Sequence, residues 1–324
     1  MLFRSAEALE FPCVRLDAAS DGTIVALLES ARNKGRVEVF ASNGERISAF
    51  AAPYVPNDVA VDTVHRLVYV GGTRPGQTAR GEIGGVAYLD AFKFDGTVAW
   101  KNYGIDPGTK TDLKSHTSCE RLSMGADGKL YGAFLSIGGS HIFSRDPKSI
   151  ESKVKLHGTD AYSQAYATGH TYITFVARFD PGTGGLLAGQ LLLGRDKTRK
   201  GTDVSPIGGN IVADEQGRIY LVGRAESGGP AVTGSFGRAD FSGHEGFFCI
   251  FSSDLQRREF YTSFNSTAQG GSALHTVAIP RNRGTGPAFA LGGSVYADSG
   301  GMRVVNAQQP AKSTGQDGYF SISE

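Results

Sequence analysis

The stretch PNDVAVDTVHRLVYVGGTRPG, from Pro56 to Gly76, predicts two short β-strands joined by a tight turn. Apolar and polar residues alternate with a period of two on both sides of the turn, as in strands that bury one face. Asn57 and Asp58 precede the first apolar run, and their pair has two interpretations. It can form a turn through hydrogen bonds to its own backbone, or it can supply oxygen ligands to a metal.

The same pattern recurs along the chain, with strand, polar turn and strand in each copy. The copies are CVRLDAASDGTIVALLES (13–30), CERLSMGADGKLYGAFLS (119–136), GGNIVADEQGRIYLVGRA (208–225) and, more loosely, SALHTVAIPRNRGTGPAFALGG (272–293). A second, aromatic-containing hairpin follows at a variable distance, as in VEVFASNGERISAF (37–50) and AYLDAFKFDGTVAW (87–100). Two successive hairpins make a four-stranded antiparallel unit, and the repeat of such units predicts an all-β fold with a single β-propeller domain.

The spacing of the copies favours six blades. Their expected bounds are 11–54, 55–115, 116–158, 159–204, 205–268 and 269–324 plus 1–9. The alternative is five blades, because ITFVARFDPGTGGLLAGQLLL (173–193) resembles a second hairpin, which would make 137–170 one long insertion. The end of the chain, DGYFSISE, matches the third strand of a blade. We therefore expect the last blade to be closed by strands from both termini, which removes exposed sheet edges.

Composition excludes several classes of protein. The 324 residues include 33 basic and 32 acidic residues with a net charge of +1, which is not the footprint of a nucleic-acid-binding protein. No stretch approaches the ~20 apolar residues that a membrane span requires. The three cysteines, Cys13, Cys119 and Cys249, form no CxxC motif, and neither HExxH nor GxSxG is present, so no cofactor is expected.

Residues 208–264, from GGNIVADEQGRIYLVGRA to FFCIFSSDLQRREFYTSF, resemble the bacterial β-propeller repeat family named for seven-bladed propellers. The shared features are an apolar strand, an Asp-x-x-Gly turn, a second strand, a Gly-rich loop and an aromatic strand. The resemblance covers about half of the chain. It implies a propeller of an extracytoplasmic or cell-surface assembly, and it implies no particular activity.

The shorter segment PNDVAVD (56–62) is similar to a part of the gluconolactonase/senescence-marker family, which are six-bladed propellers with a central calcium ion. This resemblance implies that Asn57 is a calcium ligand. Asp58, Glu120 and Asn210 are the further candidates for such a site. The alternative function that follows is a calcium-dependent hydrolase or lactonase, whereas the turn interpretation of Asn57 and Asp58 needs no metal.

The long insertions are expected at one end of the propeller, where connections between the second and third strands and between blades emerge. Loops of this kind frequently carry function. The candidate binding residues are Tyr54, Arg74, Arg80, Asp112, His116, Arg224, Arg238, His244, Tyr296 and Arg303. The first functional hypothesis is a non-enzymatic binding or scaffolding propeller that engages a protein or glycan partner through this face.

Overall fold

The computed structural model describes residues 11–78, 83–104, 110–111, 116–137, 142–154, 172–195, 201–226, 245–264, 271–280, 289–295 and 317–323. Nearly all regular structure in these residues is β-strand. Most strands pair with a sequence neighbour in antiparallel orientation, so the predicted hairpins are present.

The strands form five sheets of three or more strands in the described part of the chain. The first sheet is β1 (Cys13–Ala18), β2 (Ile24–Ala31), β3 (Lys34–Phe40) and β4 (Arg46–Ala51). The second is β5 (Val55–Asp62), β6 (Leu67–Thr78), β7 (Ile83–Lys93) and β8 (Val98–Asn102), with β9 (Lys110–Thr111) parallel to β6. The third is β10 (Thr117–Met124), β11 (Leu130–Ile137), β14 (Tyr172–Phe179) and β15 (Leu186–Leu192).

The fourth sheet is β18 (Val204–Ser205), β19 (Ile211–Ala213), β20 (Ile219–Ala225), β21 (Glu245–Phe251) and β22 (Arg258–Phe264). The fifth is β23 (Ser272–Ala278), β24 (Phe289–Val295) and β25 (Asp317–Ser323). Short elements complete the set: the 3-10 helix η1 (Ile142–Ser144) and the strand pairs β12 (Arg145–Asp146) with β13 (Ser149–Lys153) and β16 (Gly194–Arg195) with β17 (Gly201–Thr202).

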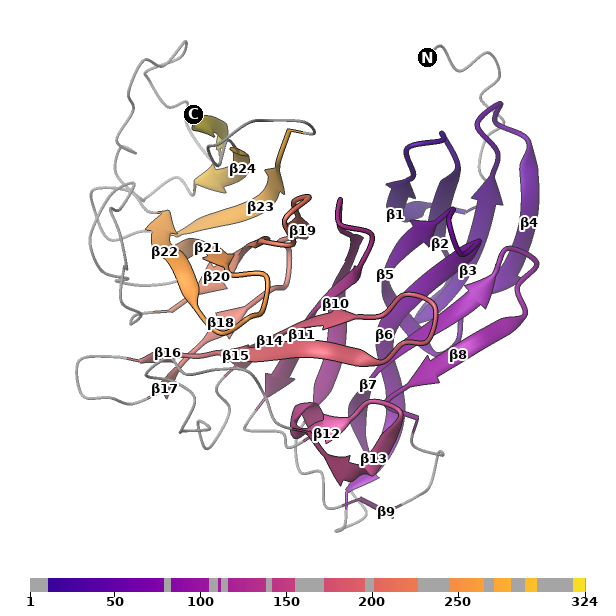
Figure 1. Ribbon diagram of the computed structural model, residues 1–324, viewed down its shortest axis with the longest axis horizontal. Coiled ribbons are helices and arrows are strands. Elements are labelled where there is room, and N and C mark those ends of the chain that lie inside the picture. Colours follow the sequence, from indigo (N-terminus) through magenta and orange to yellow (C-terminus); the bar gives the residue numbers. More distant parts are fainter. Residues whose placement is uncertain are drawn as a thin grey trace.

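The five sheets surround a common axis in Figure 1, with the strands β1, β5, β10, β19 and β23 nearest to the centre. Each of these inner strands is the first strand of its sheet or, for β19, part of the interrupted first strand. The first and the fifth sheet lie on the two sides of an opening at the top of this view. The all-β propeller architecture predicted from the repeat is confirmed.

The blade boundary expected between residues 158 and 159 is not present. β11 pairs with β14 over the whole length of both strands, from Leu130 opposite Phe179 to Ile137 opposite Tyr172. The segments expected as the third and fourth blades therefore share one four-stranded sheet, with residues 138–171 inserted between its second and third strands. The described sheets follow the five-blade alternative. β25 is the third strand of the last sheet, as expected, and residues 1–9 lie outside the described residues.

Tight turns explain the aspartates that precede the second strand of several sheets. The Asp127 carboxylate accepts a hydrogen bond from the backbone nitrogen of Lys129, and Gly128 has a φ of 72°, a left-handed value that glycine adopts without strain. The same carboxylate accepts the hydroxyl of Tyr131 at 2.7 Å, and Asp214 accepts that of Tyr220 at 3.1 Å. These aspartates stabilise the hairpin turns.

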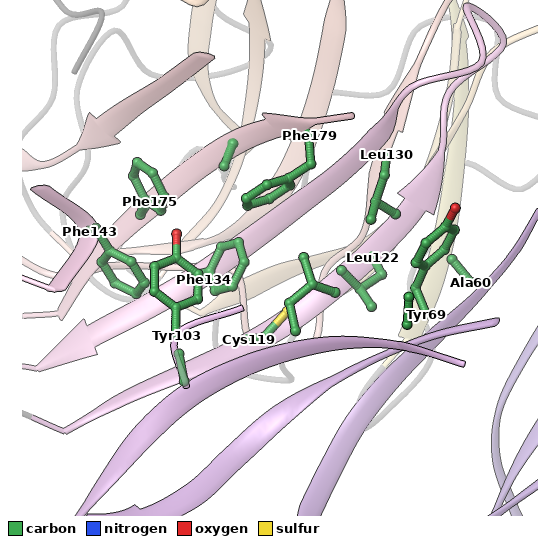
Figure 2. Packing of buried hydrophobic residues seen from close by; sticks show 14 of the residues in the cluster. Ala60, Tyr69, Tyr103, Cys119, Leu122, Leu130, Phe134, Phe143, Phe175 and Phe179 are labelled. Carbon is green, nitrogen blue, oxygen red and sulfur yellow. The ribbon is translucent and has the colours of Figure 1, made fainter. Parts of the chain in front are cut away.

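The core lies between neighbouring sheets. Figure 2 shows the cluster between the second and third sheets, where Tyr69, Cys119, Leu122 and Phe134 are buried. A Cβ atom added at Gly71 would lie 3.1 Å from the Cβ of Cys119, so this glycine allows the two sheets to approach each other. Cys249 is buried as well, whereas Cys13 is exposed.

Part of the insertion in the third sheet packs against the second sheet. On one side, the ring of Phe143 stacks on Phe175 of β14 in the third sheet, with a centroid distance of 4.7 Å. The backbone nitrogen of Tyr103 donates to the carbonyl of Pro147 at 2.7 Å. The ammonium of Lys148 lies 4.7 Å from the centroid of the Trp100 ring. The segment 142–154 thus joins two sheets.

Candidate functional site

The inner strands share a local irregularity that sets the direction of their polar side chains. In β1, β5, β10 and β23 one extra residue interrupts the pairing with the second strand, and these bulge residues are Val14, Asn57, Glu120 and His275. In the fourth sheet, residues 206–210 interrupt the first strand at the same place. Because a bulge redirects the side chains next to it, the residues that follow it can point toward the neighbouring sheet.

Asn57 and Asp58 connect the second sheet to the third. The Asn57 side chain donates from Nδ2 to the carbonyl of Cys119 at 3.0 Å. The Asp58 carboxylate accepts hydrogen bonds from the backbone nitrogens of Leu122 at 2.9 Å and Val59 at 3.0 Å. Burial raises the pKa of Asp58 to about 6, against the opposing effects of these bonds and of the nearby guanidinium groups. This pair therefore has a role in joining sheets.

Two further residues that follow a bulge have the same role. Asn210 is the counterpart of Asp58 in the fourth sheet. Asp58 directly precedes Val59, which pairs with Val70, and Asn210 directly precedes Ile211, which pairs with Leu221. It accepts from the backbone nitrogen of Val277 at 2.7 Å and donates to the carbonyl of Val277 at 3.1 Å. The guanidinium of Arg121 donates to the carbonyl of Gly209. The third, fourth and fifth sheets are thus joined by side chain to backbone hydrogen bonds.

These bonds bear on the residues proposed as metal ligands. Both polar side-chain atoms of Asn210 and Oδ2 of Asp58 are bonded to backbone groups of the next sheet, and Oδ1 of Asp58 accepts from Val59 in its own strand. Glu120 accepts the hydroxyl of Ser118. Across the described residues, no group of three or more His, Cys, Asp or Glu side chains is arranged to hold a metal ion. The structure accounts for the Asn57–Asp58 pair without a metal, and the calcium site stays a prediction.

A second group of polar residues lies at the end of the second sheet from which the long connections emerge. The Arg74 guanidinium is buried between two aromatic rings, 5.2 Å from the centroid of Tyr54 and 5.4 Å from that of Tyr88. The Tyr88 hydroxyl donates to the carbonyl of Pro53 at 2.6 Å, which fixes the chain next to Tyr54. This Tyr54–Arg74 cluster consists of Tyr54, Arg74, Tyr88 and Asp90.

Tyr54 differs from the rest of the cluster because its ring is partly open to solvent. The residue is 36% exposed, whereas Arg74 is 4% exposed. Its φ of 53° lies in the left-handed region, which a bulky residue rarely adopts without cost. Tyr103 and Leu255 have similar φ values of 54° and 56° but are fully buried, so Tyr54 differs from them in its exposure. The packing of Tyr54 on Arg74 and against Tyr88, at 5.7 Å between centroids, holds the ring in this position.

The electrostatics of the cluster are set by a buried carboxylate. Asp90 Oδ1 lies 3.5 Å from Nη2 of Arg74, which also donates to the carbonyl of Asn102 at 3.2 Å. Burial raises the pKa of Asp90 to about 6, and Arg74 opposes this rise. The Nε of Arg74 is buried and has no hydrogen-bond partner among the residues that the structure describes. Arg74 is therefore fixed within the sheet, and Tyr54 is the member of the cluster that is open to a ligand.

The other predicted binding residues are placed as follows. His116 precedes β10, and its Nδ1 accepts the backbone nitrogen of Gly85 at 3.1 Å, so it lies against β7 of the same second sheet. Arg224 is in β20 of the fourth sheet and does not belong to this group. Tyr88 and Asp90 were not predicted, although their alternation in β7 could have indicated them. Outside the described residues lie Arg80, Asp112, Arg238, His244, Tyr296 and Arg303.

The chain matches no protein-family model, and no curated protein matches it. Among solved structures, it is similar to a protein from Lactobacillus plantarum, with 11% identity over 96% of this chain and 88% of that chain and a TM-score of 0.41. An apocarotenoid oxygenase from Synechocystis has 13% identity over 91% of this chain and 59% of its own, with a TM-score of 0.44. The WD40 β-propeller domain of Doa1 has 10% identity over 90% and 92% of the two chains and a TM-score of 0.30.

These similarities are too distant to support a conclusion about the function of this chain. Within the described residues, no helix has the length and apolarity needed to cross a membrane.

Proposed function

We propose that the protein is a non-enzymatic binding propeller that engages a protein partner through the end of the sheets carrying the long connections, with Tyr54 as an anchor. The observation that carries the proposal is the partly exposed Tyr54 ring, held in a left-handed backbone conformation over the buried Arg74. Tyrosine and arginine are enriched among the residues that dominate binding energy at protein interfaces.

The topology supports the same end of the molecule. The insertion between β11 and β14, the segment between β20 and β21 and the segment between β24 and β25 all join second to third strands. The strand ends that they join therefore lie at one end of the sheets, as do the strand ends joined by the connections between sheets. Tyr54 lies in one of these connections, between β4 and β5. A scaffold of rigid sheets with long loops at one end suits recognition of a large partner.

A protein partner is favoured over a glycan because most of the described sheets have no aromatic residue at the position of Tyr54. By strand register, the counterparts of Tyr54 in the third, fourth and fifth sheets are Thr117, Val204 and Ser272, and the counterpart in the first sheet is Phe11. A glycan-binding propeller would be expected to present an aromatic ring at this place in several sheets. The resemblance to the bacterial propeller repeat family further suggests an extracytoplasmic or cell-surface assembly as the setting.

The test compares three forms of the protein in cross-linking and affinity capture from the source cells: the natural sequence, Tyr54→Asn and Leu187→Asn. Asparagine tolerates the left-handed conformation, so the first variant removes the ring and keeps the turn. Leu187 is exposed on the third sheet and serves as the matched control.

We expect one specific protein to be retained by the natural sequence and by Leu187→Asn. With the purified partner, Tyr54→Asn should weaken binding by at least about tenfold, the effect of removing an anchor residue. Equal binding by all three forms, or no specific protein partner, would overturn the proposal.

A further inference from the structure

We infer that the propeller has a closing seam: the fifth sheet packs onto the inner strand β1 of the first sheet, and the opening between these two sheets is one of two states of the molecule. The inference is independent of the proposed partner. It rests on two features that four sheet junctions share, on a third feature of the junction between the second and third sheets, and on the parts of this pattern present at the fifth junction.

The first element of the pattern is an apolar residue two positions after the bulge, which packs on the preceding sheet. Val59 belongs to a core cluster with the first sheet, Leu122 to one with the second and Val277 to one with the fourth. Ile211 has the same place against the third sheet. The counterpart in β1 is Leu16, by the register of its bulge.

Leu16 is the exception in exposure. Its four counterparts, Val59, Leu122, Ile211 and Val277, are between 1% and 7% exposed, whereas Leu16 is 61% exposed. The exposure is confined to the inner strand, because Ala26 and Leu28 in β2 are buried. In the other four sheets this position is covered by the neighbouring sheet, and at Leu16 that cover is missing. The neighbour of the first sheet on this side of the axis is the fifth sheet.

The second element is a polar residue directly after the bulge, which reaches the inner strand of the next sheet. Arg15 of the first sheet lies 3.8 Å from Asp58 of the second, and Asp58 is hydrogen-bonded to Leu122 of the third. Arg121 of the third sheet is hydrogen-bonded to Gly209 of the fourth, and Asn210 of the fourth to Val277 of the fifth. The counterpart in β23 is Thr276. Thr276 is exposed, and in the described part of the chain its hydroxyl makes no bond to another sheet. The backbone group of β1 that corresponds to the backbone nitrogens of Leu122 and Val277 is that of Leu16.

The third element is a cysteine facing a glycine. At the junction of the second and third sheets, Cys119 packs against Gly71, which pairs with Asp58. Cys13 occupies the place of Cys119 directly before its bulge. In the fifth sheet the residue that pairs with Thr276 is Gly292, in the place of Gly71. The fifth sheet therefore has space for Cys13 at the position where closure would put it, which identifies this sheet as the occupant of the β1 surface.

A cysteine pair tests the closure directly, since a Cβ atom at Gly71 would lie 3.1 Å from that of Cys119 at the equivalent junction. Disulfides form at Cβ separations near 3.5–4.5 Å. The test variant is Gly292→Cys, which can pair with the natural Cys13. The matched control is Val64→Cys, placed in the turn between β5 and β6, where Val64 is 87% exposed. Both proteins are oxidised mildly and mapped by peptide mass spectrometry.

We expect Gly292→Cys to form an intramolecular disulfide with Cys13 in the monomer, at least about tenfold faster than any disulfide in Val64→Cys. Disulfide-linked dimers would indicate that a second copy covers β1, and an unreacted pair would indicate a permanently open seam. Either result would overturn the inference.

A second measurement needs no new residue in the fifth sheet. It compares the maleimide labelling rate of Cys13 in the native and unfolded natural protein. Closure predicts at least about tenfold protection of Cys13, together with a thermal midpoint lowered by several degrees in Leu16→Ser. Labelling of Cys13 at the rate of the unfolded chain would overturn the inference.

Discussion

The carboxylate of Asp58 accepts a hydrogen bond from the backbone nitrogen of Leu122 at 2.9 Å, so a side chain of the second sheet is bonded to the inner strand of the third. Asn210 makes the equivalent bond to Val277, from the fourth sheet to the fifth. Side chains of the types that bind metal ions thus join neighbouring sheets of the propeller by hydrogen bonds.

Asp58→Ala should lower the free energy of unfolding by about 1–3 kcal/mol, because it leaves the buried backbone nitrogens of Leu122 and Val59 without their acceptor. Urea unfolding followed by circular dichroism measures the loss. Glu29→Ala is the control, since Glu29 is exposed on β2 and should leave stability unchanged. A loss no larger than that of the control would contradict the role of Asp58.

Asp58 should also give the protein a specific pH dependence. Its folded-state pKa of about 6 lies above the ordinary value of 3.8, so the folded chain binds this proton more tightly than the unfolded chain. The associated stability is present below about pH 4 and is lost as the pH rises through 6, on the order of 3 kcal/mol.

Comparison with Asp58→Asn isolates this effect from the other carboxylates. Between pH 4 and 7, the free energy of unfolding of the natural protein should fall more steeply than that of Asp58→Asn. Parallel curves for the two proteins would show that Asp58 does not titrate in this range.

Gly71→Ala should destabilise the junction of the second and third sheets. The added methyl group would lie 3.1 Å from both the Cβ of Cys119 and Cδ1 of Leu122 and would force the two sheets apart, at a cost of about 1–3 kcal/mol. Adding Cys119→Ala should recover part of the loss, because it removes the sulfur nearest to the new methyl group. Thermal melts of the single and double variants measure this coupling, and strictly additive losses would contradict the contact.

Lys148→Gln should loosen the segment 142–154 from the second sheet. Removing the ammonium over the Trp100 ring costs about 0.5–1 kcal/mol, which corresponds to roughly two- to fivefold faster hydrogen exchange at the Tyr103 amide bonded to Pro147. Lys153→Gln is the control, because Lys153 is exposed on β13. Unchanged exchange at Tyr103 in Lys148→Gln would contradict this docking.

The sequence predicted the hairpins well, because alternation and Asp-Gly turns are local signals. The turn between Met124 and Leu130 is an example. The sequence favoured the wrong division of residues 116–204 into blades. β11 pairs with β14 across a long insertion, and the alternation of apolar and polar residues gives no information about pairing across an insertion. The contact of Tyr54 with Arg74 could not be predicted either, because it depends on a turn geometry with a left-handed φ.

The candidate metal ligands show the same limit. The oxygen chemistry of Asn57, Asp58 and Asn210 is visible in the sequence, but the direction of each side chain is set by a bulge and by the neighbouring sheet. A single sequence contains both interpretations of such residues. The hydrogen bonds between sheets are what support the structural one.

The most direct test of this account is the stability loss of Asp58→Ala, measured by thermal unfolding once in calcium and once in chelator. If Asp58 joins the second sheet to the third, the loss is the same in both buffers. A loss that appears in calcium and disappears in chelator would show that Asp58 acts through a bound metal, and it would contradict the scaffold role assigned to the Asn57–Asp58 pair.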